Sequence, residues 1–244
     1  MMNEATPLAS DPAVRYRQAR ITHWDDIARQ SETWRGRGGY YHRRLAEVYQ
    51  FWVAPGQRVL ELGCAQGDLL AALQPSNGVG VDFSGEMINR ARKRHPALRF
   101  IQADARVFES DETFDVIILS DLLNDAWDVQ SILERVAHMT EPHTRLLINT
   151  YSRLWEPVLG LAGRLNLATP VLHQNWLTVH DVKGLLSLAG FETIRQWQEV
   201  LWPFDTPLLH GFSILWLVAR YRLHRAGMWR SRQFASFRER YRQV

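Results

Sequence analysis

Cysteine is almost absent from this 244-residue sequence, which contains only Cys64. A single cysteine excludes an intramolecular disulfide framework and is typical of proteins that fold in a reducing compartment. Cys64 lies inside a glycine-containing turn, and we interpret it as a small packing residue rather than as a nucleophile. The sequence therefore predicts a cytoplasmic protein whose fold depends on an apolar core.

Long apolar runs are also missing. The longest uncharged apolar stretch of note, residues 206–219, is shorter than the ~20 residues that span a bilayer. Residues 1–12 contain two acids and no apolar segment of the kind found in signal peptides. We expect neither a transmembrane helix nor a leader, and the 46% hydrophobic content suits one α/β domain with extensions.

Two groups of catalytic motifs are lacking as well. The sequence has no Cys-x-x-Cys and no histidine pair with a carboxylate at metal-ligand spacing, so we expect no metal site. It has no Gly-x-Ser-x-Gly, the motif that places the nucleophile of many serine hydrolases. The sequence therefore favours neither a metalloenzyme nor a serine hydrolase.

The most informative segment, residues 58–73, reads as a buried strand, a tight turn from Gly63 to Gly67, and a helix. A dinucleotide-binding turn would have glycine at three positions, but Ala65 and Asp68 occupy the second and third. A carboxylate at the third position repels a pyrophosphate. The pattern thus favours a nucleoside ligand that is cationic and lacks phosphates.

Four motifs along residues 40–200 resemble, in order and spacing, those of class I S-adenosylmethionine-dependent methyltransferases. They are the turn with Glu61, Gly63, Cys64 and Gly67, the acid Asp82, the segment Gln102-Ala-Asp-Ala105, and the segment Phe114-Asp-Val-Ile-Ile-Leu-Ser-Asp121. One departure is Ala65, where the family usually has glycine. The resemblance implies that S-adenosylmethionine is the cofactor.

The resemblance also implies a Rossmann-like, doubly wound α/β fold with a mostly parallel seven-stranded sheet and an antiparallel last strand. We expect an amino-terminal helical cap or lid in residues 1–54, with helices at 19–30 and 40–52. The methyltransferase core is expected at 55–222, with an insertion at 151–177 that sets specificity. Candidates for the last two strands are residues 191–200 and 212–221, after a helix at 181–189.

Cofactor-binding residues follow from the same resemblance. Asp82 is expected to accept hydrogen bonds from both ribose hydroxyls, because an ionised carboxylate offers two acceptor oxygens. Asp104 and Ala105 are expected near adenine, and Trp34 and Tyr41 are lid candidates near the methionine portion. The full expected set is Tyr41, Glu61, Gly63, Cys64, Gly67, Asp82, Phe83, Asp104, Ala105 and Ser120.

Methyl transfer from a sulfonium is an in-line displacement, so the enzyme mainly aligns two groups and excludes water. A hydroxyl acceptor would be helped by a base that removes its proton. Our candidates, in order, are His173, Tyr151 and His42, with Asp121 and Asp125 also considered. A structural or surface role remains the alternative for each.

The carboxyl-terminal tail, residues 223–244, is basic and amphipathic. Residues 220–244 contain eight arginines and one acid, and the apolar side chains at positions 234, 237, 241 and 244 fall on one helical face. Three interpretations stay open. The tail docks on the core or is disordered, residues 229–244 contact the inner face of a membrane, or, least favoured, the tail binds nucleic acid.

Short motifs at residues 155–157, 174–177 and 188–191 resemble bacterial methyltransferases that accompany glycosyltransferases of polysaccharide pathways. The resemblance favours a small-molecule or glycan acceptor methylated at oxygen. A catalytically silent cofactor-binding scaffold, docked to a membrane or partner through the tail, is the alternative. An RNA methyltransferase is disfavoured, because Ser120-Asp-Leu-Leu123 stands where base N-methylating enzymes have an Asn/Asp-Pro-Pro-Tyr tetrad.

Overall fold

The structure is a computed structural model that describes residues 11–30, 39–150, 156, 172 and 174–197. The chain divides into two units, residues 1–197 and 198–244, and every described residue belongs to the first. Among the helices of these residues, none is long and apolar enough to cross a membrane.

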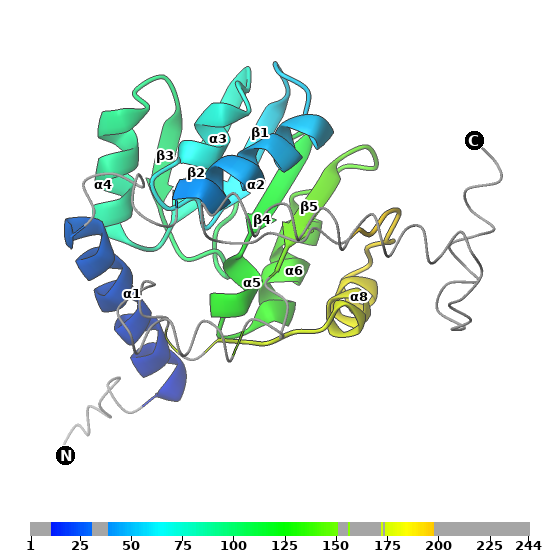
Figure 1. Cartoon of the computed structure of the whole chain (residues 1–244). Helices are drawn as coiled ribbons and strands as arrows, with labels where there is room; N and C mark the ends of the chain where they lie inside the picture. Colours follow the sequence, from blue (N-terminus) through cyan, green and yellow to red (C-terminus); the bar gives the residue numbers. More distant parts are fainter. Residues whose placement is uncertain (1–10, 31–38, 151–155, 157–171, 173, 198–244) are drawn as a thin grey trace, which may run out of the picture. The chain divides into compact units, whose positions relative to one another are not determined.

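After an opening helix pair, the described strands and helices alternate except at two places, where one strand directly follows another and one helix directly follows another (Figure 1). The strands are β1 (Arg58–Leu62), β2 (Asn77–Asp82), β3 (Arg99–Gln102), β4 (Val116–Ser120) and β5 (Arg145–Asn149). The helices are α1 (Pro12–Gln30), α2 (Gly39–Trp52), α3 (Asp68–Ala72), α4 (Gly85–Arg94), α5 (Leu122–Asp125), α6 (Val129–His138) and α8 (Val179–Leu188).

The five strands form one parallel sheet in the order β3-β2-β1-β4-β5. Leu60 of β1 pairs with Val79 of β2 on one side and with Ile117 of β4 on the other. Every side chain from Val116 to Leu119 is fully buried, as expected for a central strand covered on both faces. The strand order reverses between β1 and β4, which makes the sheet doubly wound.

Helices cover both faces of the sheet, and alternate side chains of each strand enter different core clusters. Val59 packs with buried residues of α2, α3 and α4. Leu60 belongs to the cluster of α6, against which partly buried residues of α8 pack. The described part is therefore a three-layer α/β domain, and the Rossmann-like prediction is confirmed at this level.

Two helix starts follow capping rules. Ser84 caps α4, because its hydroxyl oxygen accepts a hydrogen bond of 3.1 Å from the Met87 amide. The helix α1 begins at Pro12 and not near residue 19 as predicted. The reason is that Asp11 accepts a hydrogen bond of 2.9 Å from the Ala13 amide and proline suits the first helical position.

The last two predicted strands fall mostly on residues that the structure does not describe. The described part of the first candidate, residues 191–197, is not a strand, so this portion of the prediction is wrong. Its side chains are largely exposed, Ile194 to 86%, whereas the central strand β4 is buried on both faces. Residues 198–200 and 212–221 lie outside the described residues, and seven strands therefore remain a prediction.

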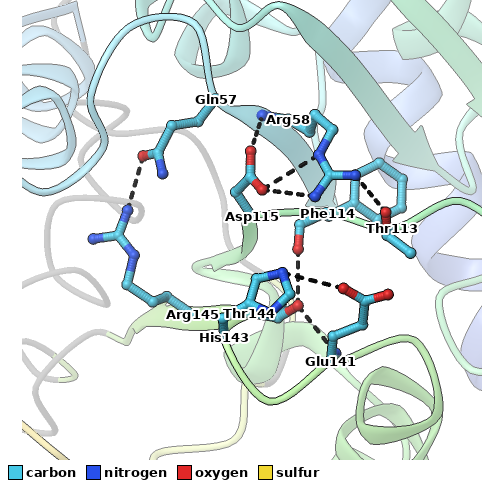
Figure 2. Close-up of polar contacts among 9 residues, drawn as sticks. All are labelled: Gln57, Arg58, Thr113, Phe114, Asp115, Glu141, His143, Thr144 and Arg145. Atoms are coloured by element: carbon cyan, nitrogen blue, oxygen red, sulfur yellow. Dashed lines mark hydrogen bonds and ion pairs between the residues drawn. The ribbon is translucent and has the colours of Figure 1, made fainter.

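A polar network closes the amino-terminal edge of the sheet, away from the ends where parallel strands bind ligands (Figure 2). The backbone amide and the guanidinium of Arg58 each donate to Asp115 at 2.8 Å. Thr144 donates to the Phe114 carbonyl at 2.8 Å, and Arg145 donates to Gln57 at 2.8 Å. These contacts fix the starts of β1, β4 and β5 relative to one another.

Candidate active site at the carboxyl ends of the strands

The turn between β1 and α3 lies where the strand order reverses. Gly63 and Gly67 have φ of 76° and 75°, values that L side chains rarely adopt. A Cβ on Gly67 would lie 2.5 Å from the Phe100 ring, and one on Gly63 would lie 3.0 Å from Leu122. Ala65 also takes a left-handed φ, 45°. The backbone therefore passes close to its neighbours, and only glycine fits at both Gly63 and Gly67.

Asp82, at the end of β2, joins this turn to the start of α4. Its two carboxylate oxygens accept hydrogen bonds from the Ala65 amide (2.9 Å) and the Ser84 amide (2.8 Å). Only 8% of the residue is exposed. Burial raises the pKa of Asp82 to about 6, and the charges of Asp25 and Asp125 act in the same direction against the two amide hydrogen bonds. The predicted ribose-binding residue is thus buried and fixed in orientation.

Asp104 follows β3 and is held by arginines. Its carboxylate pairs with Arg106 at 2.8 Å and with Arg17 of α1 at 3.3 Å. Burial alone would raise the pKa of Asp104. The hydrogen bonds from Arg106 and the charges of both arginines outweigh burial, so the pKa lies below its usual value. The carboxylate expected near adenine is therefore ionised and ion-paired, and the neighbouring Ala105 is buried.

Glu61 and Cys64 are buried beside the turn. Glu61 is 2% exposed, and its Oε2 atom has no hydrogen-bond partner among the described residues. Burial raises the pKa of Glu61 well above its usual value, with further contributions from the charges of Asp82 and Asp68. Burial likewise raises the pKa of the Cys64 thiol, which supports a packing role, because the thiolate is the reactive form.

A hydrogen-bond network covers the ends of β4 and β5. Tyr41 of α2 donates to Asp121 at 2.8 Å, and the Asn149 amide donates to the other Asp121 oxygen. Tyr49 donates to the Asn149 side chain at 2.7 Å. Ser120, the last residue of β4, is half-buried next to this network. Tyr49 and Asn149 were missed from the sequence, since nothing local distinguishes them from packing residues.

The structure describes one of the three predicted bases. His42 lies on α2, half-buried, with its ring 5.4 Å from that of Tyr41. Burial lowers the pKa of His42 to about 4, although the charge of Asp68 opposes the shift. Tyr151 and His173, together with the lid candidate Trp34, lie outside the described residues. Phe83, the residue after Asp82, is half-buried.

Helix α1 supplies site residues that sequence reasoning missed. Arg20 pairs with Asp125 at 2.9 Å, and the Trp24 indole donates to the same carboxylate at 2.7 Å. Asp25 accepts a hydrogen bond from the Ser84 hydroxyl.

No group of three metal-ligating side chains occurs among the residues that the structure describes. A hollow of about 320 Å³ lies at the amino ends of β2 and β3 and is lined by Pro75, Asn77, Arg99 and Glu112. It is at the opposite edge of the sheet from the candidate active site.

The sequence is similar to a methyltransferase family model and to individual methyltransferases. A family model described as a methyltransferase domain matches residues 33–196. A demethylmenaquinone methyltransferase from Beutenbergia cavernae is 33% identical over 125 residues, 49% of this chain and 52% of that protein. A ubiquinone biosynthesis O-methyltransferase from Bradyrhizobium diazoefficiens is 29% identical over 115 residues, 44% of this chain and 46% of that protein. The chain thus spans about half the length of these relatives.

Solved structures share the fold at lower identity. The magnesium protoporphyrin IX methyltransferase of Synechocystis, solved with bound S-adenosylhomocysteine, has a TM-score of 0.56 and 18% identity, covering 75% of this chain and 89% of that one. An S-adenosylmethionine-dependent methyltransferase from Thermotoga maritima has a TM-score of 0.58 and 18% identity, covering 71% and 81%. These likenesses concern the fold.

Proposed function

The chain belongs to the methyltransferase domain family, and on that premise we propose that it transfers a methyl group from S-adenosylmethionine to a small-molecule or glycan acceptor, at oxygen. The observation that carries the proposal is the position of Asp82, whose carboxylate bridges the Ala65 and Ser84 amides. Each carboxylate oxygen keeps acceptor capacity beyond these bonds. Asp82 therefore keeps acceptor capacity for two adjacent ribose hydroxyls.

The surrounding residues fit a cationic nucleoside. Glu61 has a buried oxygen that no described residue contacts by a hydrogen bond, and the carboxylates of Asp82 and Asp68 lie close enough to raise its pKa. A cationic ligand would favour the ionised form of Glu61, whereas a phosphate would disfavour it. At Gly63 and Gly67 the missing Cβ lets Leu122 and Phe100 pack against the turn, which fixes its backbone beside Asp82. These features support S-adenosylmethionine over a dinucleotide.

In methyl transfer from a sulfonium, the main role of the protein is to align the methyl donor with the acceptor. S-adenosylmethionine brings a methyl group that is already activated by the sulfonium. Alignment of two reactants and exclusion of water can lower a barrier by on the order of 7 to 11 kcal/mol in favourable cases. With a pKa of about 4, His42 is a weak base at neutral pH. The order His173, Tyr151, His42 for the base is retained in the proposal.

Several finer features belong to the same proposal. The Bradyrhizobium relative is named an O-methyltransferase, which supports oxygen as the methylated atom. The motifs at 155–157, 174–177 and 188–191 support a polysaccharide-related acceptor. We place the protein in the cytoplasm, with residues 229–244 contacting the inner membrane face, and we retain a seven-stranded sheet with an antiparallel last strand. In this proposal the amino-terminal lid comprises residues 1–54, the methyltransferase core residues 55–222, and the basic tail residues 223–244.

The test is methyl transfer itself. Protein and S-adenosylmethionine with a tritiated methyl group are incubated with phenolic, carboxylic and glycan acceptors and with fractions of a bacterial extract. We expect tritium in a low-mass or glycan product, with one S-adenosylhomocysteine formed per methyl transferred. Saturable cofactor binding without any product would contradict enzymatic transfer and support the scaffold alternative.

A further inference from the structure

Helix α1 is held mainly by polar contacts. Of its described side chains only Arg20 and Ala28 are buried, although the helix is 19 residues long. It packs beside α4 (Figure 1). A helix with so little apolar burial gains little from the hydrophobic effect, so its position depends on the charged and hydrogen-bonded groups that it contacts.

Those groups lie on three successive loops at the carboxyl edge of the sheet. Asp25 accepts from the Ser84 hydroxyl, after β2. Arg17 pairs with Asp104, after β3, at 3.3 Å. Arg20 pairs with a residue of α5, after β4. Helix α1 therefore crosses the edge where parallel α/β sheets bind their ligands.

The third contact is the best buried. The side chains of Arg20 and Asp125 are 6% and 13% exposed and lie 2.9 Å apart. The Arg20 Nε also donates to the Asp125 carbonyl at 3.0 Å, and the Trp24 indole donates to the carboxylate at 2.7 Å. The Arg20 guanidinium lies 3.5 Å from the centre of the Tyr16 ring. Removal of one partner from such a pair leaves a buried charge uncompensated.

Two of the three loops carry residues assigned above to the nucleoside. Asp104 itself touches α1, and Ser84 follows Asp82 by two residues and donates its amide to that carboxylate. A nucleoside held by Asp82 and Asp104 would lie next to the face of α1 that bears Arg17 and Asp25. Its release would require α1 to move.

We propose, resting on the function proposed above, that α1 is the roof of the cofactor site and that Arg20, Trp24 and Asp125 form the latch that holds it closed. The latch is a positioning device that touches no reacting atom. The rate at which cofactor leaves is then set by the opening of the latch, as for lids that gate other enzymes.

The experiment measures the dissociation of tritiated S-adenosylhomocysteine from the full-length protein by dilution into excess unlabelled ligand. The latch variants are Arg20→Lys, Trp24→Phe and Asp125→Asn. The control is Arg15→Lys, since Arg15 is an exposed residue of the same helix. Hydrogen exchange of the α1 amides, with β1 and β4 as the reference for an intact fold, is recorded on the same samples.

We expect dissociation at least tenfold faster in Arg20→Lys and Asp125→Asn, a smaller increase in Trp24→Phe, and a change of less than twofold in Arg15→Lys. Exchange at residues 16–28 should accelerate while β1 and β4 stay protected. Unchanged dissociation in variants whose α1 amides exchange rapidly would overturn the latch and leave the proposed function intact. Failure of the folded wild type to bind the ligand at all would overturn both.

Discussion

The hydroxyl of Tyr41 donates a 2.8 Å hydrogen bond to the carboxylate of Asp121 and so ties α2 to the first residue after β4. Asp121 has a φ of 55°, a left-handed conformation that persists in non-glycine residues only where the surroundings enforce it. Two side chains hold Asp121 in place, because Asn149 of β5 donates to the carboxylate oxygen that Tyr41 does not contact. Such strain is typical of functional sites.

Substitutions in this network should lower stability in a defined order. Tyr41→Phe removes one hydrogen bond and should lower the free energy of unfolding by about 1 kcal/mol. Asp121→Ala removes both bonds and keeps the left-handed strain, so we expect a loss of about 2 to 3 kcal/mol. Asp121→Asn should lose less, because asparagine tolerates this conformation. Urea unfolding measures all three, and an Asp121→Ala variant as stable as wild type would refute the role of the network.

The glycine turn gives a prediction with an internal control. Gly67→Ala would place a methyl group 2.5 Å from the Phe100 ring at a φ of 75°, and should destabilise the protein by about 2 to 4 kcal/mol. Gly184 lies in α8, and a Cβ added there would have no atom of the described residues within 4 Å, so Gly184→Ala should stabilise by about 0.5 to 1 kcal/mol. Thermal unfolding that shows the same shift for both variants would contradict the described turn.

Asp82 should make the stability of the free protein depend on pH. Its pKa is about 6 in the fold, against an ordinary value of 3.8, because burial disfavours the charged form. Between these values the folded protein binds more protons than the unfolded chain. The contribution of Asp82 is therefore fully present below about pH 4 and is lost as pH rises through about 6, by on the order of 3 kcal/mol.

The measurement is urea unfolding from pH 4 to pH 7 on wild type and Asp82→Asn. Other carboxyl groups change the absolute curve, since the pKa values of Asp104 and Asp128 lie below the usual range and favour stability at higher pH. The difference between the two proteins removes these contributions and reports Asp82 together with its coupling to Glu61, whose pKa the charge of Asp82 raises. We expect wild type to lose stability relative to Asp82→Asn as the pH rises, and a constant difference would show that Asp82 is not buried as described.

Local signals in the sequence were sufficient for most of the domain. The apolar run from Val116 to Leu119 forms a strand and Ser84 caps a helix, and both of these signals act through neighbours in the chain. Glycine at two positions of the turn was likewise predictable, because positive φ is a local demand. The start of α1 was misjudged, since the capping role of Asp11 was overlooked.

Contacts between distant segments could not be predicted in the same way. Arg20 and Asp125 are 105 residues apart, and no local pattern in the sequence indicates that they pair. Asn149 becomes recognisable only when Tyr49 and Asp121 converge on it. The candidate strand at 191–200 was based on the family resemblance, and its large apolar residues fall at every third position instead of alternating. A strand also needs a partner edge, which this sequence does not specify.

The central claim, that Asp82 holds the nucleoside of S-adenosylmethionine, is tested most directly by calorimetric titration of S-adenosylhomocysteine into wild type, Asp82→Asn and Asp115→Asn. Asp115 is the matched control, because it is a carboxylate at the amino-terminal edge of the same sheet, paired with Arg58. We predict saturable binding that Asp82→Asn weakens at least tenfold, about 1.4 kcal/mol, and that Asp115→Asn changes less than twofold, with no binding of NADH. Equal affinity of wild type and Asp82→Asn, or no binding by the folded wild type, would contradict the claim.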